Sequence, residues 1–165
     1  MGGFPRSGKS TFVSYCKEII GENYTLDIST VDLVKHLAAL AGWDGTKTPK
    51  NRTFLSDLKQ LLIEWDDVPY KDVIRTAQNA RTDLDAYGVN HTLYVFVQCR
   101  EPEEIQKFVD RVGAHTIFIS RKDHETPTNE SDIATRRYNY EATIFNDGDL
   151  DQLKLCAQAY VKSLN

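Results

Sequence analysis

The chain has 165 residues, of which 41% are hydrophobic, 10% aromatic and 27% charged, and its formal net charge is −4. This length suits one domain, and the apolar content excludes a disordered chain. The acidic balance argues against a broad nucleic-acid or membrane surface, because such partners require a basic face. No apolar run approaches the ~20 residues of a membrane span, and no signal peptide is visible.

The first predicted element is a phosphate-binding loop at residues 3–11, GFPRSGKST. Gly3, Gly8, Lys9 and Ser10 fill every fixed position of G-x-x-x-x-G-K-[ST]. The glycines let backbone N–H groups turn toward an anion, the lysine can reach the β- and γ-phosphates of ATP, and the serine hydroxyl can ligate Mg²⁺. The alternative is a glycine-rich turn that caps a helix. The predicted cofactor contacts are Gly3, Arg6, Ser7, Gly8, Lys9, Ser10 and Thr11.

The residues before this loop are too few for an ordinary strand. A P-loop normally follows a buried central strand of about five residues, and only Met1 and Gly2 precede Gly3. We therefore expect that the chain starts upstream of Met1 or lacks its first strand.

Short β-like runs then alternate with helical patterns. Strands are predicted at residues 24–29, 92–97, 115–120 and 142–145. Helices are predicted at residues 9–20, 49–65, 69–87, 102–112, 133–140 in part and 150–164. A further helix is predicted to begin at a capping box in residues 29–32 and to end near Gly42. It carries the apolar stripe Leu33, Leu37 and Leu40.

This alternation predicts a parallel sheet covered by helices on both faces. Together with the P-loop, it predicts an α/β P-loop NTPase fold in a single domain, residues 1–165. Residues 30–88, with two adjacent helices, are the expected substrate-binding segment. The polar residues 121–131 are the expected lid. Both should lie over the phosphate end of the sheet.

Four stretches resemble the nucleoside and nucleotide kinases, and most of all the phage-type deoxynucleoside monophosphate kinases and their uncharacterised bacterial relatives. The stretches are the P-loop, DISTVDLVK at 27–35, REPEEI at 100–105, and NESD at 129–132 with YNY at 138–140 and NDG at 146–148. The resemblance implies a phosphotransferase that uses ATP and Mg²⁺ to phosphorylate a nucleotide-like monophosphate. Its partner would be a small nucleotide, with no nucleic acid or membrane.

One departure from that family concerns the metal site. The family has an aspartate two positions before its arginine, and here Gln98 precedes Arg100. The Mg²⁺ shell must then rely on Ser10, on water and on Asp32 or Glu101.

Several charged residues are candidates for contacts beyond the loop, each beside a structural alternative. Arg100 would bind a substrate phosphate or pair with Glu103 or Glu104 at the surface. Arg52, near a helix start, would bind the monophosphate or belong to a solvated turn. Asp32 would act as a base or contact a substrate hydroxyl, or serve only the capping box. The lid candidates are Arg121, which could clamp the triphosphate, and Arg136 and Arg137, of which at most one faces the site.

The three cysteines, Cys16, Cys99 and Cys156, are odd in number and lack C-x-x-C spacing. They are therefore expected to be reduced thiols of a cytoplasmic protein. The four histidines show no paired metal spacing. Trp65 should pack, and Trp43 should pack or stack on a base.

Three functions fit these patterns. The first is a small-molecule kinase that catalyses phosphoryl transfer with Lys9, Asp32, Arg100 and Arg121. The second is a P-loop NTPase or a nucleotide-binding switch that acts through a partner, which the missing strand-end aspartate favours. The third is a polynucleotide 5′-kinase, which the acidic charge opposes. The oligomeric state and the phosphate acceptor do not follow from the sequence.

Overall fold

A computed structural model of the chain describes residues 1–3, 6–122 and 130–164. The chain has a mixed α/β fold and divides into two compact units. Unit 1 comprises Met1–Asp27 and Gln98–Asn165, and unit 2 comprises Ile28–Val97. The predicted substrate-binding segment, residues 30–88, therefore falls within unit 2. In the described part of the chain, no helix has both the length and the apolar character needed to cross a membrane.

Unit 1 contains a parallel sheet in the order β1-β4-β5. Its strands are β1 (Gly2–Gly3), β4 (Ile117–Ser120) and β5 (Ala142–Phe145). Gly2 and Gly3 pair with Phe118 and Ile119, so Gly2 and the first glycine of the P-loop form a two-residue strand. All four β4 residues are buried. The predicted parallel pairing is confirmed.

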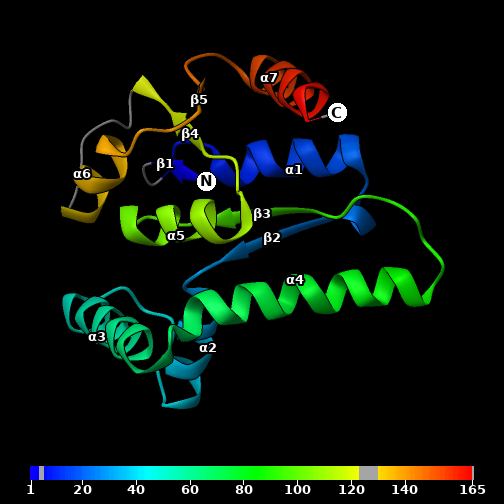
Figure 1. The fold of residues 1–165 in the computed structure, drawn as a ribbon. Coiled ribbons are helices and arrows are strands. Elements are labelled where there is room, and N and C mark those ends of the chain that lie inside the picture. Colours follow the sequence, from blue (N-terminus) through cyan, green and yellow to red (C-terminus); the bar gives the residue numbers. More distant parts are fainter. Residues whose placement is uncertain (4–5, 123–129, 165) are drawn as a thin grey trace. The chain divides into compact units, whose positions relative to one another are not determined.

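The helices of unit 1 pack an apolar core beside this sheet. They are α1 (Lys9–Ile20), α5 (Pro102–Val112), α6 (Glu130–Arg137) and α7 (Leu150–Ser163). Helix α7 runs alongside α1 (Figure 1). Phe12, Cys16 and Ala157 have no exposed surface, and the rings of Phe12 and Tyr160 lie 5.7 Å apart. Burial of large apolar side chains contributes about 1.5–3 kcal/mol each, so this contact fixes α1 behind the P-loop.

The limits of α6 differ from the prediction. A helix was expected to begin near residue 133, but α6 begins at Glu130 and ends at Arg137. The last two residues of the expected lid are therefore helical. Residues 123–129, which make up most of that lid, lie outside the described residues.

Strands β2 (Thr25–Ser29) and β3 (Tyr94–Gln98) form a separate two-stranded sheet. A short 3-10 helix, η1 (Glu22–Tyr24), leads into β2. Just beyond β3, the Cys99 N–H donates to the Met1 carbonyl oxygen at 3.3 Å. The chain after β3 is thus placed next to the residue that precedes β1.

Unit 2 holds three helices, α2 (Asp32–Leu40), α3 (Pro49–Asp66) and α4 (Val68–Ala86). Helix α3 begins as predicted, with Thr48 accepting a hydrogen bond from the Asn51 N–H at 3.2 Å and with Pro49 in the first turn. Asp67, at φ 53°, ends α3 and starts α4.

The predicted apolar stripes only partly face the interior of unit 2. On α2 the buried residues are Val34 and Ala38, whereas Leu40 is 73% exposed. On α3 Leu62 is buried, whereas Trp65 is 78% exposed, so the packing role predicted for Trp65 is wrong. Helical periodicity identified both helices, but it could not identify which side of each stripe the neighbouring helices cover.

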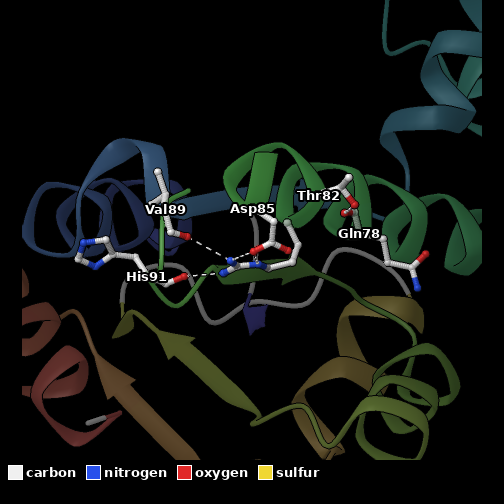
Figure 2. A network of polar contacts seen from close by, with 6 residues as sticks. Gln78, Thr82, Asp85, Val89 and His91 are labelled. Atoms are coloured by element: carbon white, nitrogen blue, oxygen red, sulfur yellow. Dashed lines mark hydrogen bonds and ion pairs between the residues drawn. The ribbon is translucent and has the colours of Figure 1, made fainter. Parts of the chain in front are cut away.

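Hydrogen bonds from Arg81 join the end of α4 to the segment that leads to β3. Figure 2 shows Asp85, Val89 and His91, which belong to this network. The Arg81 guanidinium donates to the carbonyl oxygens of His91 at 2.6 Å and Val89 at 3.2 Å, and it pairs with Asp85. The hydrogen bond from Arg81 lowers the pKa of Asp85. A planar guanidinium can serve three acceptors at once, which explains an arginine here.

Candidate nucleotide-binding site

The P-loop connects β1 to α1 through unusual backbone angles. Gly3 has φ +142°, Gly8 has φ +96°, and Arg6 has φ 63°. Glycine reaches positive φ without steric cost, whereas a side chain resists it. The exposed Arg6 is therefore a strained position of the loop, as is common at ligand sites. Phe4 and Pro5 lie outside the described residues.

Both loop glycines also lack room for a side chain. A Cβ on Gly3 would lie 2.6 Å from the Ile119 carbonyl oxygen, and a Cβ on Gly8 would lie 2.3 Å from Asn146 Nδ2. Real Cβ atoms do not approach other atoms so closely. The motif glycines are thus required by close packing as well as by backbone angle.

No capping or acidic side chain within the first turn of α1 balances the positive end of its helix dipole. Gly8 is its N-cap, no side chain caps it, and its first turn has no acidic residue. The first N–H groups of such a helix lack intrahelical partners and carry the positive end of the helix dipole. An anion placed here would satisfy both features.

Lys9 adds a cation to the loop. Its Nζ donates to the Gly3 carbonyl oxygen at 2.7 Å, so the ammonium lies at the beginning of the loop. The neighbouring Ser10 is exposed in the first turn of α1. The start of the loop therefore combines an ammonium, a hydroxyl and the first N–H groups of a helix, which are the groups that bind nucleotide phosphates and their cation.

Ser7 provides an independent indication of a missing ligand. Its side chain is fully buried, and its Oγ has no hydrogen-bond partner in the part of the chain that the structure describes. Leaving a buried hydroxyl unpaired costs about 1–3 kcal/mol. The donor set of the loop thus fits a bound phosphate ligand, which could supply the partner that Ser7 lacks.

The turn after β5 supports the loop from the other side. Asn146 Nδ2 donates to the Ser7 carbonyl oxygen at 2.9 Å, and Asn146 is itself only 6% exposed. Its backbone N–H donates to the Ser120 carbonyl oxygen at 2.8 Å. Asp147 accepts from the Lys122 N–H at 2.8 Å. The sequence analysis named residues 146–148 only within a stretch that resembles the kinase family, so it missed the supporting role of Asn146.

A second residue missed by the sequence analysis is Asp27. Gln98, at the end of β3, donates through Nε2 to Asp27 Oδ1 at 2.8 Å. Cys99, next to Gln98, donates its N–H to the Met1 carbonyl oxygen. The Gln98–Asp27 pair therefore lies close to the residues that lead into the P-loop.

The predicted cations of unit 1 lie around the P-loop strand. Arg100 is exposed, and it makes no ion pair with Glu103 or Glu104 in the described part of the chain, so that alternative is wrong. The Thr135 hydroxyl donates to the Arg100 carbonyl oxygen, and α6 also contacts β1. This places α6, which carries Arg136 and Arg137, beside the segment of Arg100. Arg121 follows β4 and is half-buried.

The predicted acceptor residues Asp32 and Arg52 belong to unit 2. Asp32 accepts from the Ser29 N–H at 2.9 Å, which is half of the predicted capping box, and pairs with Lys35 at 3.2 Å. The box does not start the helix as predicted, because α2 begins at Asp32 with Val31 as its N-cap and without a side-chain cap. Arg52 is exposed and donates through Nε to the Lys47 carbonyl oxygen at 3.3 Å. Nearby, Trp43 donates through Nε1 to the Thr46 carbonyl oxygen at 3.0 Å.

Among the described residues, no three or more histidine, cysteine, aspartate or glutamate side chains form a group that could hold a metal ion. Mg²⁺ is commonly held by one or two protein groups together with substrate phosphates and water. Exposed Ser10 fits that mode of binding, with the cation arriving on the nucleotide. The three cysteines are free thiols.

The chain matches no family model, and no curated protein matches it. Among solved structures, the chain is similar to a mutant of the APS kinase of Mycobacterium tuberculosis, with 16% sequence identity and a TM-score of 0.46. The match covers 99% of this chain and 92% of that chain. The case for a nucleotide site therefore lies in the geometry of Gly3 and of residues 6–10.

Proposed function

We propose that this protein is a phosphotransferase that moves the γ-phosphoryl group of ATP–Mg²⁺ to a nucleotide-like monophosphate. The observation that carries the proposal is the P-loop itself. Its glycines have no room for a side chain, its helix start is uncompensated, and the buried Ser7 hydroxyl lacks a partner. These features together favour a bound polyphosphate over a plain helix-capping turn.

Phosphoryl transfer requires positioned cations and the exclusion of water more than it requires covalent chemistry by the protein. Lys9 and the first N–H groups of α1 would hold the β- and γ-phosphates. Ser10 would contact the Mg²⁺ ion, which neutralises phosphate charge when bound. The ammonium of Lys9 would exchange its hydrogen bond to the Gly3 carbonyl oxygen for one to phosphate.

The remaining cations would serve the transferred group and the acceptor. Arg100, Arg121 and one of Arg136 and Arg137 are the candidates for the developing negative charge. Arg52 and Asp32 are the candidates for the acceptor phosphate and sugar. The role proposed for Arg100 at the transferred group is supported by its side chain, which has no competing ion pair among the described residues.

The first experiment measures binding of a fluorescent ATP analogue to the wild-type protein, to Lys9→Ala and to Lys162→Ala. Lys162 is an exposed lysine of α7 and serves as the matched control. Lys9→Ala should lose binding by at least about tenfold, since charge-assisted hydrogen bonds contribute about 1.5–3 kcal/mol, and Lys162→Ala should bind as the wild type does. Equal binding by all three proteins would contradict a nucleotide site at this loop.

The second experiment identifies the reaction. Labelled ATP and a panel of nucleoside monophosphates are incubated with the protein, and the products are separated by thin-layer chromatography. Transfer of label to one class of monophosphate, absent in Lys9→Ala, is the expected result. Release of inorganic phosphate at a rate that no monophosphate changes would instead support an NTPase or a switch.

A further inference from the structure

The end of β3 differs chemically from what phosphoryl-transfer sites of this type use. Gln98 stands there with a neutral amide, which offers a cation less than a carboxylate does. Its Nε2 is turned toward another side chain, the carboxylate of Asp27 on the neighbouring strand β2, at 2.8 Å. The neighbouring strand β2 therefore carries, in Asp27, the carboxylate that the end of β3 lacks.

The Asp27 carboxylate is both accessible and held in position. It is exposed, and the hydrogen bond from Gln98 fixes the position of Oδ1. Its Oδ2 accepts no hydrogen bond from any residue that the structure describes. One carboxylate oxygen is thus held in place while the other is open.

The position of this pair along the sheet relates it to the P-loop. Cys99 follows Gln98 directly, and its N–H donates to the Met1 carbonyl oxygen, two residues before Gly3. All of these residues belong to unit 1.

We propose that Asp27 supplies the carboxylate that holds the hydrated magnesium ion of a nucleotide bound at the P-loop, and that Gln98 is the positioning residue that aims it. This inference rests on the proposed function. Mg²⁺ prefers oxygen ligands and keeps several waters, so one hydroxyl, one carboxylate and the phosphate oxygens suffice. Ser10 and Asp27 provide that set, although β3 lacks an aspartate.

The test compares the affinity for a fluorescent ATP analogue in excess Mg²⁺ with that in excess EDTA. Asp27→Asn keeps the shape of the side chain and removes its charge. Asp110→Asn is the matched control, because Asp110 is also exposed and also accepts from a glutamine Nε2, that of Gln106, at 2.8 Å. The double variant Asp27→Asn/Gln98→Asp moves the carboxylate to the end of β3.

The wild type and Asp110→Asn should bind the analogue more tightly with Mg²⁺ than with EDTA. Asp27→Asn should lose about tenfold or more of its affinity in Mg²⁺ and should bind as the wild type does, or more tightly, in EDTA. The double variant should regain the Mg²⁺ effect, because its new carboxylate replaces the lost one beside the cation.

The outcomes separate this inference from the proposed function. A Mg²⁺ effect that is unchanged in Asp27→Asn would overturn the role of Asp27 and leave the nucleotide site standing. A double variant that fails to regain the effect would overturn the inference that the Gln98–Asp27 pair lies beside the cation. A wild type that binds the analogue in neither condition would overturn the proposed function itself.

Discussion

Asn146 and Ser7, 139 residues apart, are joined by a buried hydrogen bond of 2.9 Å from the asparagine side chain to the serine carbonyl oxygen. The contact ties the turn after β5 to the middle of the P-loop. It also places Asn146 Nδ2 2.3 Å from the position that a Cβ on Gly8 would take. The conformation of the loop therefore depends on a residue near the other end of the chain.

Removing this contact should loosen the loop. Asn146→Ala leaves the Ser7 carbonyl oxygen without its donor, at a cost of about 1–3 kcal/mol in the free energy of unfolding. Affinity for ATP should fall as well, because the N–H groups of the loop are held less firmly. Urea denaturation and nucleotide titration measure the two effects. Asn139→Ala, at an exposed asparagine, is the control, and equal loss in both variants would contradict the role of Asn146.

Gly8→Ala should destabilise the protein more than its backbone angle alone explains. Gly8 and Gly42 have nearly equal φ values, +96° and +95°, but a Cβ on Gly42 would meet nothing within 4 Å. Gly42→Ala therefore measures the cost of positive φ, about 1 kcal/mol, and any excess in Gly8→Ala measures the clash with Asn146. We expect an excess of at least about 1 kcal/mol by thermal unfolding. No excess would show that Asn146 moves aside freely.

Local sequence signals predicted most of the fold, because they report local physics. Thr48 and Pro49 set the start of α3, and the predicted limits of α1, α5 and β5 match the structure. The P-loop was also visible, since its chemistry lies within nine consecutive residues. Each of these elements is specified by neighbours in the sequence.

The supporting residues of the site could not be predicted in this way. The bond from Asn146 to Ser7 spans 139 residues, and that from Gln98 to Asp27 spans 71. No periodicity or motif records which side chains a fold brings together at such separations. The exposure of Trp65 was missed for a similar reason, because its stripe identifies a helix without identifying what covers it.

Removal of Arg52 or Arg100 should affect the acceptor rather than ATP. Each arginine is exposed, and a charge-assisted contact to phosphate contributes about 1.5–3 kcal/mol. Arg52→Ala and Arg100→Ala should therefore raise the KM for the monophosphate about tenfold or more and leave ATP affinity nearly unchanged. Steady-state kinetics with the acceptor varied at saturating ATP measures this. Loss of ATP affinity in both variants would contradict the assignment of the acceptor site.

The Cys16 thiol should make stability fall at alkaline pH. Burial raises its pKa to about 12 in the folded protein, whereas an unfolded cysteine has a pKa of about 8.5. The folded state thus retains the thiol proton where the unfolded state releases it. This contribution to stability is fully present below the unfolded pKa and is lost as pH rises above it, by about 1.4 kcal/mol per pH unit.

The Cys16→Ala variant isolates this effect from that of Tyr138, Tyr140 and Tyr160, whose pKa burial also raises. Between pH 9 and 11 the free energy of unfolding should fall less steeply with pH in the variant than in the wild type. The difference in slope should correspond to about one proton, as measured by urea denaturation across that range. Thiol labelling at pH 8 gives a second readout in the wild type. Half-buried Cys156 should react well before Cys16, which has no exposed surface. Early labelling of Cys16, or equal slopes in the two proteins, would contradict a buried thiol beneath α7.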